Sequence, residues 1–187
     1  MKKKLISVPI LALLMLFTVA PAMAAPATKV PVTIASSTTG MTFGDFWVTD
    51  GGVVQMRDFA SDGEVFLQVA SSPPVAYQLT THRDFSVTIN IGKDIPFPGP
   101  WPDAKGITHS SVVWTYSVNG QVQGTFKGEW TLKFVGWTII DPAKFIVTNG
   151  PSEGHAVLQG DGVFAGQTLF LDSAGPPTVF TGYLLDR

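Results

Sequence analysis

The chain has 187 residues, a low content of charged side chains (14%), a formal net charge of −2 and no cysteine. Without cysteine, disulfides, thiolate metal sites and cysteine catalysis are excluded. The mildly acidic charge balance argues against a nucleic-acid partner, because no basic stripe is present to neutralise phosphates.

The first 24 residues predict a cleaved signal peptide. Lys2, Lys3 and Lys4 form a basic region, residues 5–20 are apolar, and Ala22-Met23-Ala24 supplies small residues for cleavage after Ala24. The apolar run is shorter than the ~20 residues of a spanning helix, so we expect no stable membrane span after cleavage, with a retained anchor as the alternative. Cleavage leaves 187 − 24 = 163 residues with a net charge of −2 − 3 = −5. We therefore expect an exported protein, secreted or held in the cell envelope.

Short candidate strands follow the signal peptide. Residues 25–40 are expected to form a leader with a first strand at Val30–Ile34 and a polar turn or linker at 36–39, and residues 41–187 the main domain. Period-two alternation or aromatic and β-branched residues then predict strands at 43–48, 53–59, 64–69, 75–80 and 85–91. Turn residues separate several of these strands, at Asp50-Gly51-Gly52, Asp62-Gly63 and Ser71–Pro74.

Residues 92–106 form the one long segment without a strand pattern. It contains four prolines, with Phe97 and Trp101 between them. Loops of this length are uncommon inside a compact domain, and many act as lids over a binding site. We therefore predict that Phe97 and Trp101 cap the mouth of the domain.

Residues 110–137 give the clearest signal, a hairpin of two long strands joined at Asn119-Gly120. Even positions are mostly apolar in both arms and odd positions are mostly polar, which indicates strands with one buried and one wet face. A two-residue turn would place even residues opposite odd ones, so we predict a three-residue loop with Gly120 in the left-handed conformation. This register sets Trp114 opposite Gly124 and Val112 opposite Phe126, unless a bulge at Gly124 moves it by one residue.

Further strands are expected at 145–148, 155–159, 163–171 and 179–185, again with Gly and Pro turns between them. No segment after the signal peptide shows sustained helical periodicity. We therefore predict an all-β fold, a single antiparallel β-barrel of about eight to ten strands, with a β-sandwich as the alternative. The barrel is favoured because closure removes exposed sheet edges.

The C-terminal part of the chain carries a family resemblance. The run Gly160-Asp161-Gly162-Val163-Phe164-Ala165-Gly166 is followed by a strand, a Pro-rich turn and Val179-Phe180-Thr181-Gly182-Tyr183. This pattern resembles the last strands of allene oxide cyclase-like and dirigent-like proteins, which are eight-stranded barrels that hold apolar small molecules. The resemblance implies a barrel with a cavity, and no catalytic residue of those families can be matched to a position in this chain.

No residue pattern predicts a catalytic, metal or cofactor site. The three histidines lie on separate segments without metal-ligand spacing, and no G-x-S-x-G or dinucleotide-loop spacing occurs. Several aspartates precede glycine, which is typical of turns, and the acidic group near residue 60 lacks EF-hand spacing. The residues considered for these roles are His82, His109, His155, Asp50, Asp58, Asp62, Glu64, Glu129, Asp161 and the glycines at 160, 162 and 166.

Aromatic side chains on the predicted inner faces suggest a lined cavity. Tyrosine combines an apolar body with a polar tip, which suits a ligand-orienting role, although side chains alone can fill a small barrel. The candidate ligand-binding residues are Tyr77, Trp114, Tyr116, Trp130, Phe134 and Tyr183.

Three functions fit these patterns. The first is a secreted binding module for an apolar or aromatic small molecule. The second is a structural or adhesive envelope domain that contacts protein or glycan through Trp47, Trp101 and Trp137. The third is a cyclase- or isomerase-like barrel enzyme, which would require a buried acid or histidine facing a cavity.

Overall fold

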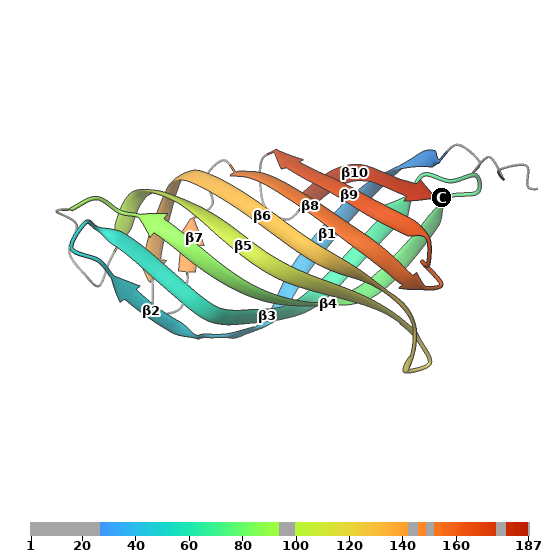
Figure 1. Ribbon diagram of the computed structural model, residues 1–187, viewed down its shortest axis with the longest axis horizontal. Coiled ribbons are helices and arrows are strands. Elements are labelled where there is room, and N and C mark those ends of the chain that lie inside the picture. Colours follow the sequence, from blue (N-terminus) through green and yellow to red (C-terminus); the bar gives the residue numbers. More distant parts are fainter. Residues whose placement is uncertain (1–26, 94–99, 142–145, 149–151, 175–178, 187) are drawn as a thin grey trace, which may run out of the picture.

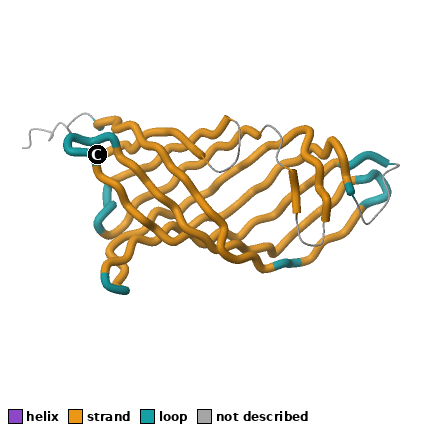
Figure 2. Tube along the Cα trace, turned by 180° about the vertical axis from the view of Figure 1, so that it is seen from behind, coloured by secondary structure: helices purple, strands orange, loops and turns teal. Residues whose placement is uncertain are grey.

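The computed structural model describes residues 27–93, 100–141, 146–148, 152–174 and 179–186. Within these ranges every regular element is a β-strand (Figures 1 and 2), and none of their residues forms a helix long and apolar enough to cross a bilayer. The strands are β1 (Thr28–Thr42), β2 (Asp45–Val48), β3 (Val53–Val69), β4 (Val75–Asn90), β5 (Trp101–Val118), β6 (Gln121–Asp141), β7 (Ile146–Thr148), β8 (Ser152–Gly162), β9 (Gln167–Ala174) and β10 (Val179–Asp186).

The ten strands form one antiparallel sheet that closes in a ring through eight of them. The order is β1-β10-β9-β8-β6-β5-β4-β3, and β3 pairs back to β1, while β2 and β7 add to β3 and β6 outside the ring. Strand β1 closes the ring because residues 28–35 pair with β10 and residues 32–42 pair with β3, so that residues 32–35 have partners on both sides. The ring is uneven: β3 to β6 continue past it towards β2 and β7, at the opposite end of the elongated molecule from the C-terminus (Figure 1).

The interior consists of two apolar clusters. The ring cluster takes side chains from all eight ring strands, and the extension cluster lies between β3, β4, β5 and β6 beyond the ring. The expected alternation is present in β6, where Phe126, Trp130 and Phe134 are buried and the intervening odd positions are more exposed. Burial of one face over the whole sheet is the main source of stability, at roughly 25 cal/mol per Å² of apolar surface.

Two predicted turns lie within continuous strands. Strand β1 passes through residues 36–39, so the predicted boundary at residue 40 falls inside it, and β3 passes through Asp62-Gly63. The inward residues of β3 change from even to odd positions at a bulge, where Asp58 has a φ of 57°. The predicted break was placed at Asp62-Gly63 because this pair is typical of a turn, whereas Gly63 is a buried residue within β3.

The central hairpin has the two-residue turn that the sequence analysis rejected. Asn119 and Gly120 both have positive φ, 51° and 76°, and Val118 pairs with Gln121. Such a turn matches the twist of the two strands. The mismatch between even and odd faces is corrected by a bulge on β6 at Gln123.

This bulge sets the register of the whole hairpin. Trp114 lies opposite Phe126, and Val112 lies opposite Gly128, so both predicted pairings are wrong by two residues. The argument for matching apolar faces was correct, because Trp114 and Phe126 are both buried. The extra residue that brings the two apolar faces together lies in β6, whereas the prediction placed it in the turn.

The predicted strand at 163–171 also begins later, since residues 163–166 form a turn and β9 starts at Gln167.

Candidate functional site

Most of the aromatic residues that the sequence predicted as ligand contacts lie in the protein's own apolar clusters or pack against them. Trp114 and Trp130 are buried in the ring cluster, and Phe134 is buried in the extension cluster. Tyr77 and Tyr116 are half-buried, with ring centres 5.3 Å apart in an edge-to-face arrangement. Five of the six candidates therefore contribute to the protein's own packing, as expected for a small ring that its side chains fill.

Phe164 fills the space among these aromatic rings. It lies in the turn after β8, and its ring stacks on Phe126 with centres 4.5 Å apart and also contacts Tyr77 and Tyr116. A Cβ on Gly124 would stand 2.9 Å from its ring, so the glycine makes room for it. Sequence analysis assigned Phe164 to a strand, and the Gly-rich turn around it was the available signal for an inserted side chain.

Of the two lid candidates, only Trp101 lies within the described residues. Trp101 is 0% exposed and belongs to the extension cluster, so it is a core residue and the prediction of an exposed lid side chain does not fit its position. Phe97 lies outside the described residues.

Trp47 and Trp137 were also predicted as surface contacts. Trp47 is 41% exposed, and Arg57 lies over its ring. The side chain of Trp137 is not among the described side chains.

Tyr183 faces outward, contrary to the prediction that it lines the interior. In β10 the buried side chains are Phe180 and Leu184, and Tyr183 is half-buried on the opposite face. Both faces of this strand carry apolar residues, so alternation alone could not identify the inner one. The ring of Tyr183 stacks on Phe170 of β9, with centres 4.9 Å apart and planes 18° apart, and Lys29 Nζ lies 4.6 Å from its centre.

The outward Tyr183 belongs to an apolar row that crosses four strands. Sheet pairing places Val157 opposite Phe170, Phe170 opposite Tyr183, and Tyr183 opposite Pro31. We call these four residues the outer aromatic row. Val157 is 46% exposed, although a large apolar side chain on a strand more often lies inside. A hollow of about 570 Å³ lies over β6, β8, β9 and β10, and three of the four residues of this row line it.

Polar groups flank the outer aromatic row on both sides. On one side His155 Nδ1 contacts the carboxylate of Asp172, directly across the β8–β9 pair, and Thr131 is the neighbour of His155 on β6. On the other side Lys127 lies opposite Gln159. The hollow therefore offers an apolar floor together with acidic, basic and amide groups at its rim.

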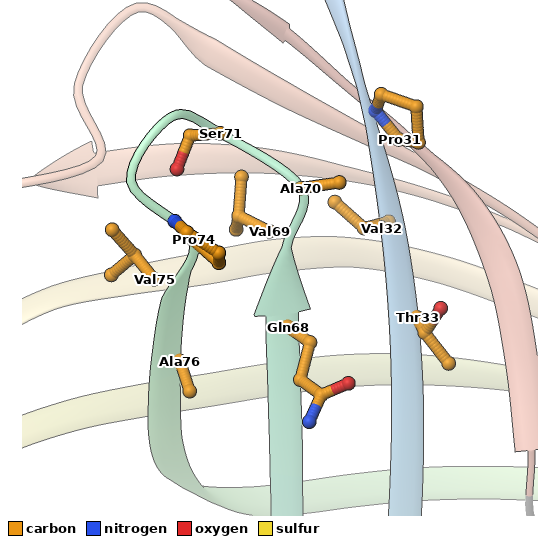
Figure 3. A pocket seen from close by; sticks show the side chains of 10 residues that line it. All are labelled: Pro31, Val32, Thr33, Gln68, Val69, Ala70, Ser71, Pro74, Val75 and Ala76. Atoms are coloured by element: carbon orange, nitrogen blue, oxygen red, sulfur yellow. The ribbon is translucent and has the colours of Figure 1, made fainter.

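A second hollow, of about 450 Å³, lies next to the outer aromatic row (Figure 3). The loop that joins β3 to β4 curls over it, and Pro31 of β1 faces it from the other side. Its lining contains prolines, valines and alanines with Thr33, Gln68 and Ser71, and no aromatic or charged side chain. It can accept an apolar group but offers little to orient one.

The remaining histidines form local contacts. His82 Nδ1 donates to Asp62 at 2.7 Å, and His82 Nε2 lies 3.3 Å from Asp84. The hydrogen bond to Asp62 raises the pKa of His82, and the charge of Asp84 adds to the effect. His109 contacts the hydroxyl of Thr131 at 3.4 Å. Within the described ranges, no group of three His, Cys, Asp or Glu residues could hold a metal ion.

The sequence analysis overlooked Arg83. Its odd position is in phase with Phe85, Val87 and Ile89, which are all buried on the inner face of β4, so alternation alone places Arg83 inside. Its guanidinium lies over the rings of Phe85 and Trp130.

The chain matches no protein-family model, no curated protein and no solved structure. The likeness of residues 160–183 to allene oxide cyclase-like and dirigent-like barrels therefore stays a prediction.

Proposed function

We propose that the protein is an exported binding module that takes an aromatic or apolar small molecule on the outer aromatic row. In this proposal the closed sheet is a rigid barrel scaffold, and residues 1–24 direct export and are removed. The ligand lies in the hollow over β6 to β10 rather than inside the ring, because the ring is occupied by Trp114, Phe126 and the other side chains of its core.

The observation that carries the proposal is the stacked pair of Phe170 and Tyr183 at the surface. Two stacked, half-buried rings on the outer face of the sheet offer an apolar surface for another ring, and aromatic pairs contribute about 0.5–1.5 kcal/mol beyond area burial. The hollow of about 570 Å³ is within the range of small-molecule pockets, ~300–1,000 Å³.

The polar rim gives the proposed site its orientation. Lys29 lies on Tyr183 and fixes that ring by a cation–π contact. The His155–Asp172 pair on one side and Lys127 on the other can accept from or donate to polar groups at the edge of a ligand. A ligand with a flat apolar face and a polar edge fits this arrangement best.

Binding of the neutral aromatic dye N-phenyl-1-naphthylamine tests the proposal. We expect its fluorescence to rise on binding, Tyr183→Ala to weaken the affinity roughly 2- to 10-fold, as expected for loss of one ring stack, and Tyr183→Phe to retain it. Phe66→Ala is the matched control, since Phe66 is an exposed aromatic residue of β3 that does not line this hollow. Equal affinities for wild type and Tyr183→Ala, or an equal loss with Phe66→Ala, would contradict the proposal.

A further inference from the structure

The interior contains a cation for which no residue in the described ranges supplies a counter-charge. Arg83 points inward from β4, with its Cζ 5.0 Å from the ring centre of Phe85 and 5.9 Å from that of Trp130. Its Nε is buried and has no hydrogen-bond partner among the residues that the structure describes. The residue as a whole is half-buried. Burial lowers the pKa of Arg83 from its usual value.

The neighbours of Arg83 on the adjacent strands supply no acid. Its cross-strand partners are Ser61 on β3 and Val112 on β5. The nearby carboxylates Asp62 and Asp84 lie on the outer face, where both contact His82. The guanidinium is therefore held between aromatic rings on the inner face, and in the described part of the chain no carboxylate is paired with it.

Two more buried polar groups near Trp130 also lack partners. Trp130 Nε1 and Ser173 Oγ are both buried without a hydrogen bond to any described residue. Both atoms lie within 3.0 Å of the point where a Cβ on Gly154 would stand, at 3.0 and 2.7 Å. The face of the Trp130 ring thus contacts the Arg83 cation, and the edge of the ring carries the Nε1 donor next to the Ser173 hydroxyl.

Groups of this kind are costly to leave unpaired. Each buried donor without a partner costs about 1–3 kcal/mol, and an unpaired charge costs more. An oxyanion would supply a negative charge for the guanidinium fork and acceptor oxygens for N–H and O–H donors. A buried water could satisfy the neutral donors, but it would leave the charge of Arg83 uncompensated.

We propose that Arg83, together with Trp130 Nε1 and Ser173 Oγ, forms an internal binding site for an oxyanion, a carboxylate or a phosphate. The site is separate from the outer aromatic row and does not depend on the function proposed for that row. The anion is either a free ion or the acidic head of an apolar chain.

Thermal unfolding of the purified protein in different anions tests this site. At equal ionic strength against sodium chloride, we expect sodium acetate or inorganic phosphate to raise the melting temperature by about 3–6 °C for each tenfold increase above the dissociation constant. Arg83→Met removes this dependence. Arg57→Met is the matched control, because Arg57 also lies over a tryptophan ring but at the surface, and it leaves the dependence unchanged.

Two conservative variants test the neutral donors without creating a large cavity. Trp130→Phe removes Nε1 and keeps an aromatic ring, and Ser173→Ala removes the hydroxyl; each is expected to weaken the anion effect about tenfold in concentration. They also keep the proposal testable if Arg83→Met fails to fold. Sodium octanoate distinguishes the two sources of the anion: stabilisation by octanoate at far lower concentration than acetate indicates the head of an apolar chain, and similar concentrations indicate a free ion.

The proposal is wrong if the wild-type melting temperature rises no more in acetate, phosphate or octanoate than in chloride. It is also wrong if Arg83→Met shows the same anion dependence as wild type. In either case Arg83 serves only as a cation packed on Phe85 and Trp130, for which replacement by an apolar residue is neutral or stabilising.

Discussion

Replacing Trp101 with alanine tests whether this residue belongs to the core or to a lid. Trp101 is 0% exposed and lies in the extension cluster with Phe134 and Ile139. A buried Trp→Ala change removes the transfer free energy of the indole and leaves a cavity, at a cost of about 3–5 kcal/mol. For a domain of this size, each kcal/mol lowers the melting temperature by about 2–4 °C. The expected loss is therefore about 6–20 °C.

Trp47→Ala is the control for this experiment, because Trp47 is 41% exposed and contacts Arg57 at the surface. An exposed cation–π contact contributes about 0.5–1 kcal/mol, so its melting temperature should fall by a few degrees at most. Thermal unfolding followed by circular dichroism measures both variants, and urea unfolding gives the free energies. If Trp101→Ala melts within a few degrees of Trp47→Ala, Trp101 is not part of the core, and the lid hypothesis becomes the better description.

Three further changes test the sheet itself. Gly128→Ala should cost roughly 3 kcal/mol or more in urea unfolding, because its Cβ would stand 2.0 Å from the backbone oxygen of Val157 and backbone cannot move aside; an unchanged midpoint would refute this close approach. Gly120→Ala should cost about 1–2 kcal/mol, since the turn requires a φ of 76°, and a neutral result would argue against the two-residue turn. The hydrogen bond to Asp62 raises the pKa of His82, so the folded state binds this proton more tightly than the unfolded state. Its stabilisation is complete below the unfolded pKa of about 6.5 and is lost as pH rises through the folded pKa; Asp62→Asn should lower the pKa of His82 in an NMR titration, and an unchanged value would contradict the pairing.

Alternation predicted the all-β class and most inward residues, because a sheet with one buried face imposes period two on its strands. From the sequence alone, it identified Trp114, Trp130 and Phe134 as inward-facing. It failed where both faces of a strand are apolar, as around Tyr183, and where a bulge reverses the phase, as at Asp58. Those two features depend on neighbouring strands, so a single strand's sequence does not contain them.

Ring closure depends on pairings between distant segments. Strand β1 meets β10 and β3, which lie far from each other in the chain. Nothing local in residues 28–42 distinguishes a strand with two partners from an edge strand. The sequence supported closure only through the general cost of an unprotected edge, and that argument gives neither the closing partners nor the uneven shape.

The predicted breaks in the strands bear on Arg83. Strands were predicted to end or begin near residues 60–63, 81–84 and 110, where the Asp62-Gly63 turn signal or polar side chains interrupt the apolar alternation. The structure keeps these strands continuous, and Ser61, Arg83 and Ser110 occupy inward positions in phase with their apolar neighbours. Strand β3 pairs Ser61 with Arg83, and β5 pairs Ser110 with Phe85, the next inward residue of β4. The three polar residues therefore lie near one another in the interior rather than in three unrelated loops. A polar residue that keeps the phase of a buried face is therefore better interpreted as a candidate binding group than as the end of a strand. For this chain, that rule selects Arg83, the one inward arginine among the described residues, whose charge an anion would neutralise.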